Sequence, residues 1–135
     1  MAHLSPADRQ GIVEVLTRYA TAIDRRDWTL LRRCFSSNFE ADYQGFGRWH
    51  GPEEITEFMR QAHADIAVTL HRLSNFEISA DGDGAAARTY CDLIMIGGDP
   101  PAVTTQAVGC YDDALIKAPT GWLIHRRKMT VFYTS

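Results

Sequence analysis

The feature that most constrains this chain is a change in the periodicity of its apolar residues near residue 66. Before this point, apolar side chains recur every three or four residues, as they do on one face of a helix. After it come runs rich in β-branched and aromatic residues, separated by turn-forming glycine, aspartate and proline: 67–80, 85–97, 103–117 and 121–133. The pattern predicts helices followed by a four-stranded meander, an α+β layout in which a curved sheet covers the helices with one face.

The first half of the chain carries three helix-start signals. Ser5-Pro6 is typical of an N-cap and a first helical residue, which predicts a helix over about residues 6–24. Asp27 can cap a second helix, and Gly51-Pro52, followed by two acids, begins a third. Between these last two, the glycine-containing aromatic segment FEADYQGFGRWHG predicts a short strand or hairpin.

Length and charge limit the class of protein. A chain of 135 residues without linker or repeat predicts one domain over residues 1–135. The net charge of −3, with no sustained run of one sign, argues against nucleic acid and against a polybasic membrane contact. No apolar run is long enough to span a membrane, and the N-terminal residues lack the features of a secretory signal.

The cysteine and histidine spacing predicts neither a disulfide framework nor a metal site. The cysteines are odd in number and lack CxxC spacing, which predicts buried thiols in a reducing cytoplasm: Cys34, Cys91 and Cys110. No HxH or HExxH motif exists, and the histidines other than His71 fall on unrelated elements. In RQAHAD, His63 is expected on a helix surface. We therefore expect no metal.

Two polar residues lie close to the apolar stripe of the first helix. Tyr19 belongs to the stripe, and Asp24 follows five residues later, after an alanine and an isoleucine and before an arginine. At about 100° per residue the two lie roughly 140° apart, so they converge only if the helix ends there or has a broad inner face. An exposed carboxylate near a helix end is the alternative for Asp24.

The strands contain further polar candidates. Alternation places Thr69, His71, Leu73 and Asn75 on one face of the run 67–80. A histidine in the middle of a strand is more often a hydrogen-bonded core residue than a catalyst, but Asp92 in the next strand is a costly carboxylate that needs a partner, and histidine is a natural one. Tyr43 is either a site residue or a rim aromatic.

The order of these residues resembles the SnoaL-like branch of the nuclear-transport-factor-2-like superfamily over nearly the whole chain. IVEVLTRYATAIDRRDWTLLRRCFSSNF is similar to the first two helices of that family, YQGFGRWHGPEEITEFMR to its strand and third helix, and LHRLSNFEIS to its histidine strand. The resemblance implies a cone-shaped α+β barrel, in which a strongly curved mixed sheet wraps around three helices and an apolar pocket opens at one end.

Within that superfamily the polar positions are closest to those of scytalone dehydratase and the bile-acid 7α-dehydratases. On this comparison the implied catalytic residues are Tyr19, Asp24, Tyr43, His71 and Asp92, although scytalone dehydratase is expected to have a histidine in place of Asp92. The residues expected to line the pocket are Trp28, Phe46, Phe58, Leu73, Ile94 and Met129.

The resemblance implies a cofactor-independent lyase of the dehydratase type, acting on a small, hydrophobic, alicyclic, polyketide-like or steroid-like substrate. His71 would be the general base oriented by Asp24, and the tyrosines would donate to a developing enolate. A ketosteroid-isomerase-like enzyme and a non-catalytic ligand-binding or dimerisation module are the alternatives. The family also implies a homodimer or higher homo-oligomer in each case.

One geometric expectation follows from electrostatics. An ionised Asp24 in an apolar cavity would be penalised by several kcal/mol without a donor. Arg25 and Arg26 follow it so closely that we expect them to point outward. His71 is then the best-placed donor, and the sequence predicts a hydrogen bond between Asp24 and His71.

Overall fold

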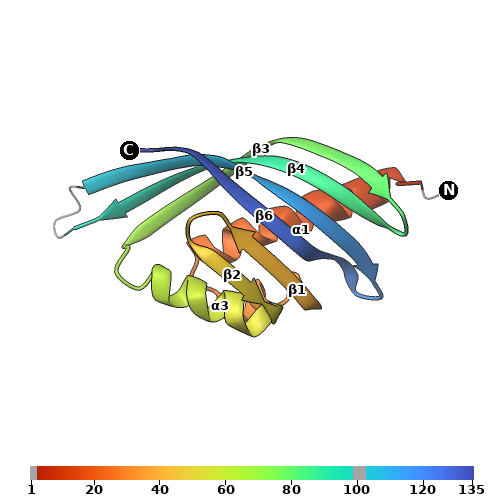
Figure 1. The fold of residues 1–135 in the computed structure, drawn as a ribbon, viewed down its shortest axis with the longest axis horizontal. Helices are drawn as coiled ribbons and strands as arrows, with labels where there is room; N and C mark the ends of the chain where they lie inside the picture. The colour runs from red at the N-terminus through yellow and green to blue at the C-terminus, as the bar shows by residue number, and fades with distance from the viewer. Residues whose placement is uncertain (1–2, 99–102) are drawn as a thin grey trace.

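The computed structural model describes residues 3–98 and 103–135 and confirms the α+β class (Figure 1). Its helices are α1 (Pro6–Asp24), α2 (Trp28–Arg32) and α3 (Gly51–Ala62). Its strands are β1 (Phe35–Tyr43), β2 (Gly47–His50), β3 (Val68–Asp81), β4 (Gly84–Gly97), β5 (Val103–Ala118) and β6 (Gly121–Thr134). The ranges predicted for the first helix and for the four later strands are confirmed to within a residue or two, and the segment expected to turn between the runs 85–97 and 103–117 lies largely outside the described residues.

The helix starts are built as their sequences predict. At the start of α1, the Ser5 hydroxyl accepts from the Asp8 backbone N–H and the Asp8 carboxylate accepts from the Ser5 N–H, each at 3.0 Å. This capping box satisfies two otherwise unpaired N–H groups. Asp27 caps α2 by accepting from the Leu30 N–H at 3.0 Å.

All six strands belong to one sheet in the order β2-β1-β6-β5-β4-β3. The β1–β6 pair is parallel, and every other neighbouring pair is antiparallel. The sheet is strongly curved and open, with β2 and β3 as its edges, which confirms the expected cone-shaped fold with a curved mixed sheet. Its mixed order places the short β1–β2 hairpin beside the C-terminal strand.

The helices cover one face of this sheet, which we call the inner face. Figure 1 shows α1 lying along the long strands and α3 beside β1 and β2. The buried side chains of α1 repeat at helical spacing and form the centre of the core with β1, β5 and β6: Ile12, Val15, Leu16, Tyr19 and Ile23. Because Tyr19 belongs to this set, its phenol is carried into the interior by ordinary amphipathic packing.

A bulge in β3 changes which residues reach the core. The register with β4 shifts between Ser74 and Glu77, and Asn75 has a positive φ of 54°. Beyond the bulge Phe76 packs against the core, so Asn75 is exposed and does not share the face of His71 as alternation had predicted. An extra residue on one strand reverses every later side chain because strand alternation has a period of two.

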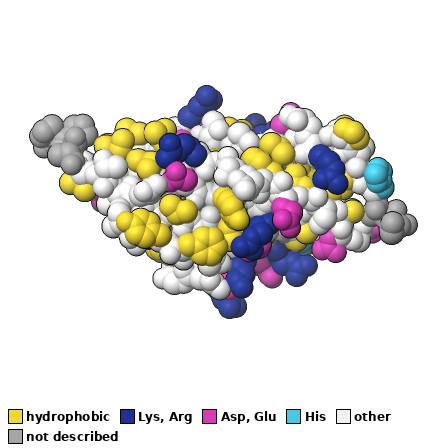
Figure 2. Space-filling view, turned by 90° about the horizontal axis from the view of Figure 1, so that it is seen from above, with side chains coloured by type: hydrophobic (Ala, Val, Ile, Leu, Met, Phe, Trp, Pro, Cys, Tyr) yellow, Lys and Arg dark blue, Asp and Glu magenta, His cyan; other side chains and the backbone are white. Residues whose placement is uncertain are grey.

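The other sheet face, the outer face, is open in this structure. Large apolar side chains are exposed on it, including Leu70 at 50% and Tyr90 at 44%. Figure 2 shows the molecule of Figure 1 from above, with hydrophobic side chains lying among basic and acidic ones. None of the helices in the described ranges is both long and apolar enough to cross a membrane.

Candidate functional site

The end of α1 and the beginning of β3 bring Asp24 and His71 together. His71 Nδ1 lies 2.6 Å from Asp24 Oδ1, and the His71 backbone N–H donates to Asp24 Oδ2 at 2.8 Å. The imidazole is 4% exposed and the carboxylate side chain 19% exposed. The hydrogen bond predicted from the sequence is therefore confirmed.

These contacts set the charge and the tautomer of the pair. Burial alone would raise the pKa of Asp24, but hydrogen bonds from the His71 side chain and backbone and from Thr69 lower it below its ordinary value. The carboxylate is then ionised and can only accept, so a neutral His71 carries its proton on Nδ1. Its Nε2 lone pair is left available, which is the state required of a general base.

Arg26 points inward, contrary to the sequence prediction. Its Nη1 donates to Thr69 Oγ1 at 2.7 Å, and its Nη2 donates to the Ile66 carbonyl at the same distance. The buried Thr69 hydroxyl in turn donates to Asp24 Oδ1 at 3.0 Å. The prediction was wrong because a long arginine side chain can fold back over the chain once the helix has ended.

A pair of tyrosines lies next to this group. The hydroxyls of Tyr19 and Tyr43 are 2.6 Å apart, and both side chains are buried. The Tyr19 ring also meets the His71 ring edge-on, with centroids 6.5 Å apart. Burial raises the pKa of both phenols, so they remain protonated donors at neutral pH. Tyr19 and Asp24 converge because α1 ends at Asp24.

Sequence reasoning missed a buried ion pair below the tyrosines. Arg127 donates to Asp113 through Nε at 2.7 Å and through Nη2 at 2.9 Å. Its guanidinium carbon lies 4.2 Å from the centre of the Tyr19 ring and 3.8 Å from that of Tyr111. Burial opposes the charge of Arg127, but the Asp113 carboxylate raises the pKa of the guanidinium.

One guanidinium nitrogen of Arg127 remains available. Its Nη1 is buried and has no hydrogen-bond partner among the described residues. A signal was present in the sequence, because Asp113 and Arg127 each occupy a position on the core-facing side of their own strand. Mid-strand charges at core-facing positions predict a buried pair once strand register is known.

His63 is buried near His71 and is not a helix-surface residue. Its Nδ1 lies 2.7 Å from the Met59 carbonyl, and its ring centre lies 6.4 Å from that of His71. Burial lowers the pKa of His63, and the nearby positive charge of Arg26 acts in the same direction. The surface prediction failed because α3 ends here and its C-terminal turn packs on Trp28.

Asp92 does not join the cluster. Its neighbour Leu93 is the residue opposite His71 in the β3–β4 register, so Asp92 lies on the outer face. There its carboxylate accepts from Arg72 at 2.7 Å and from Gln106 at 2.8 Å. The sequence prediction of a catalytic Asp92 beside His71 is corrected, because the partner that this carboxylate needs is an exposed arginine.

The residues predicted to line a pocket divide in the same way. Four of them pack against the core as partly buried side chains: Trp28, Phe58, Leu73 and Met129. Phe46, in the β1–β2 turn, is 59% exposed. Ile94 is two residues from Asp92 in β4 and therefore lies on the same outer face.

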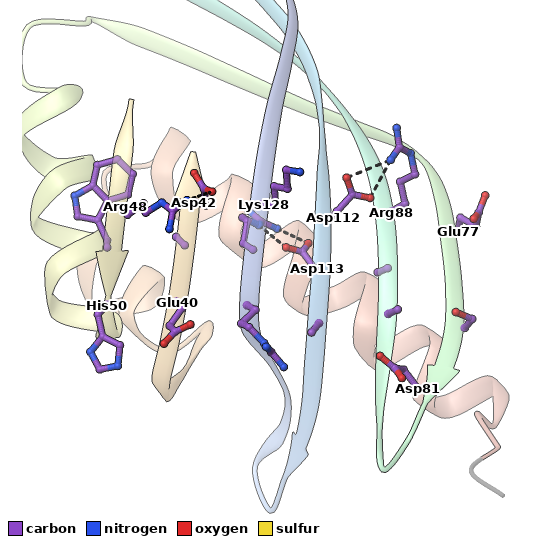
Figure 3. Close-up of a pocket in the computed structure, with 18 of the residues that line it drawn as sticks. Glu40, Asp42, Arg48, His50, Glu77, Asp81, Arg88, Asp112, Asp113 and Lys128 are labelled. Atoms are coloured by element: carbon purple, nitrogen blue, oxygen red, sulfur yellow. Dashed lines mark hydrogen bonds and ion pairs between the residues drawn. The ribbon is translucent and has the colours of Figure 1, made fainter. Parts of the chain in front are cut away.

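A groove of about 860 Å³ lies on the outer face, and the residues that line it include Asp113 and Arg127 of the buried ion pair. Its lining includes one row of side chains in register across all six strands, alternating in sign: Arg48, Asp42, Lys128, Asp112, Arg88 and Glu77 (Figure 3). Two neighbouring pairs of this row form ion pairs, Arg48–Asp42 at 3.2 Å and Arg88–Asp112 at 3.0 Å. Because each internal charge lies between two opposite ones, the row is neutralised by itself.

The side chains of the polar cluster are largely buried. Neither the outer groove nor a second groove between α1 and the β5–β6 turn is lined by Tyr19, Asp24, Tyr43 or His71. Among the residues that the structure describes, no group of three or more His, Cys, Asp or Glu side chains is arranged to hold a metal ion.

Comparison with known proteins gives a consistent family. Residues 5–128 match the model of the SnoaL-like domain. An uncharacterized protein of Mycobacterium tuberculosis is 33% identical over 126 residues, covering 92% of this chain and 85% of the relative. A protein of Mycobacterium bovis matches to the same extent.

Three solved structures share the fold. A protein of Novosphingobium aromaticivorans assigned by name as a scytalone dehydratase has a TM-score of 0.87 at 18% identity, over 96% of this chain and 87% of that one. A protein of the same organism assigned as an aromatic ring hydroxylase has a TM-score of 0.89 at 25% identity, over 98% and 95%. A hexachlorocyclohexane dehydrochlorinase, LinA type 2, has a TM-score of 0.85 at 14% identity, over 96% and 88%.

Proposed function

The chain belongs to the SnoaL-like domain family, and we propose that it is a cofactor-independent lyase that removes water from a small alicyclic, polyketide-like or steroid-like substrate. The observation that carries the proposal is the 2.6 Å contact between Asp24 and His71 Nδ1. It leaves Nε2 of His71 as a base next to two protonated phenols. Two of the structural neighbours are named for eliminations, of water and of hydrogen chloride, which supports the same class.

The proposed reaction begins with removal of a proton from the carbon beside a carbonyl. His71 Nε2 takes this proton, and the C–H electron pair forms the carbon–carbon double bond of an enolate. When the carbonyl re-forms, the bond from the β carbon to its hydroxyl breaks, and His71 returns the proton to the departing oxygen. The products are a conjugated enone and one water molecule, and the imidazole is neutral again.

The tyrosine pair supplies the hydrogen bond that the enolate needs. Of the two hydroxyl hydrogens at the 2.6 Å contact, one is used between Tyr19 and Tyr43 and the other remains for a substrate oxygen. The unpartnered Nη1 of Arg127, whose guanidinium lies over the Tyr19 ring, is a second donor. A preorganised donor aimed at developing negative charge typically contributes about 100-fold to 1000-fold in rate.

Substrate access requires a local rearrangement. Because the His71 side chain is only 4% exposed, a substrate reaches Nε2 by displacing side chains packed over it. The Asp24 end of the cluster is the more open side, at 19% exposure. Binding energy from the apolar part of a substrate would offset this displacement, which favours a hydrophobic substrate over a small polar one.

The proposal is tested with a panel of alicyclic β-hydroxy ketones in D₂O, followed by enone absorbance and by mass spectrometry. We expect turnover by the native protein and a loss of at least about 100-fold in His71→Ala and Asp24→Asn. His50→Ala, an exposed histidine at the start of α3, is the matched control and should retain activity. Products that keep the hydroxyl oxygen, with or without deuterium taken up from the solvent, would identify an isomerase instead, and no turnover with any member of the panel would overturn the proposal.

A further inference from the structure

Arg26 occupies a backbone position that favours glycine. At the end of α1 the Asp27 N–H donates to the Ala22 carbonyl at 2.8 Å and the Arg26 N–H donates to the Ile23 carbonyl at 3.0 Å. This pair of bonds is the Schellman arrangement, whose left-handed residue is usually glycine. Here it is Arg26, with a φ of 56°. A side chain with a Cβ is strained in this conformation.

The arginine side chain supplies contacts that glycine could not. Its Nη1 donates to the Ile23 carbonyl at 2.8 Å and to Thr69 Oγ1 at 2.7 Å, while Nη2 donates to the Ile66 carbonyl at 2.7 Å. The guanidinium thus joins the last turn of α1 to the segment that enters β3. A strained residue that makes such contacts beside a reactive pair points to a role in holding that pair.

The chemistry of the groups fixes the direction of each hydrogen bond. A guanidinium can only donate and an ionised carboxylate can only accept. The Thr69 hydroxyl between them must therefore accept from Arg26 and give its single hydrogen to Asp24 Oδ1, 3.0 Å away. Asp24 Oδ1 receives this hydrogen beside the one from His71 Nδ1.

We propose that Arg26 is a positioning residue that, through the Thr69 hydroxyl, holds the Asp24 carboxylate in the orientation that keeps the His71 proton on Nδ1. Its catalytic meaning rests on the proposed function, but the positioning itself is a property of the resting protein. The two hydrogen bonds from Arg26 to Asp24 pass through the neutral Thr69 hydroxyl, so the position of this hydroxyl matters more than the charge of the arginine. Removing either member should loosen the carboxylate and expose the Nδ1 proton to exchange.

The test is proton NMR of the resting protein with labelled histidine, following the exchange rate of the His71 Nδ1 proton. Arg26→Gly suits the left-handed backbone and deletes only the side chain, and Thr69→Val deletes the hydroxyl at nearly constant shape. We expect both to speed exchange about tenfold, the scale of one lost hydrogen bond. Thr69→Ser keeps the hydroxyl and should retain the native rate. Arg25→Ala, the exposed neighbour, is the control for lost charge and should also retain it.

Each outcome decides the matter independently of turnover. A native exchange rate of the His71 Nδ1 proton in Arg26→Gly or in Thr69→Val would overturn the proposed positioning role. A faster rate in Thr69→Ser would overturn it as well. If Arg26→Gly does not fold, as judged by circular dichroism, Arg26→Asn replaces it, because asparagine also tolerates the left-handed backbone and is too short to make the contacts of the guanidinium, and native exchange in that variant would overturn the proposal. A protein that turns over no ketone but shows this pattern would retain the positioning role while the proposed function fails.

Discussion

The Asp24 carboxylate accepts hydrogen bonds from both the side chain and the backbone of a single residue, His71, at 2.6 and 2.8 Å. The backbone bond fixes the position of the carboxylate along β3, and the side-chain bond fixes the rotation of the imidazole. One acidic residue at a helix end therefore joins α1 to an edge strand and sets a histidine tautomer at the same time.

Asp24→Asn should destabilise the protein in a pH-dependent way. The pKa of Asp24 is lowered in the folded state, so its contribution is present above the ordinary aspartate pKa and is lost as pH falls through the lowered folded value. We expect the variant to lose about 2 kcal/mol of unfolding free energy at pH 7, with a smaller loss at pH 3. Urea unfolding at the two pH values measures this difference.

The exposed Asp65 is the matched control for that substitution. Asp65→Asn should change the free energy of unfolding by less than about 0.5 kcal/mol at either pH. An equal loss for Asp24→Asn at pH 7 and pH 3 would contradict the assignment of an ionised, hydrogen-bonded carboxylate.

The tyrosine pair should behave as a coupled unit. Tyr19→Phe or Tyr43→Phe alone leaves one buried hydroxyl without its 2.6 Å partner, at a cost of about 1–3 kcal/mol in unfolding free energy. The double substitution removes both hydroxyls, so its cost should be smaller than the sum of the two single costs by about 1 kcal/mol. A double-mutant cycle by chemical denaturation measures the coupling, and strict additivity would show that the two hydroxyls act separately.

His63 should make the protein less stable as pH falls toward 5.5. Burial lowers the pKa of His63 in the folded state, so below about pH 6.5 the unfolded chain binds a proton that the folded chain does not. The loss of unfolding free energy between pH 7.5 and 5.5 should be smaller in His63→Leu than in the native protein. His3→Leu, at an exposed position, should leave it unchanged, and identical losses in all three proteins would exclude His63 as the titrating group.

Asp92→Asn should leave turnover within about twofold of the native value, because this carboxylate lies on the outer face and pairs with the exposed Arg72 at 2.7 Å. Exposed ion pairs contribute about 0–1 kcal/mol, so stability should change little as well. Steady-state rates on the substrate that the native protein accepts check this directly. A loss as large as that of Asp24→Asn would return Asp92 to the mechanism.

Local patterns in the sequence were sufficient for the elements and for one long-range contact. The spacing of Ile12, Leu16, Tyr19 and Ile23 predicted α1, and its observed bounds, Pro6–Asp24, agree with the expected 6–24. These succeed because periodicity and capping act over only a few residues. The Asp24–His71 contact was also predictable, because a carboxylate near an apolar core requires a donor and few donors were placed to reach it.

Only the tertiary structure decided which strand faces meet the helices and which distant charges pair. Alternation correctly grouped Asp92 with Ile94, but it cannot say which face is the inner one, and the bulge at Asn75 reversed the face of the residues that follow. The buried Asp113–Arg127 pair depends on the β5–β6 register, and the inward turn of Arg26 depends on the position of β3 beside the end of α1. A period-two pattern is symmetric between its two faces, and long side chains reach several ångströms in any direction. The packing of all elements together breaks that symmetry, and for this reason the site could be completed only in three dimensions.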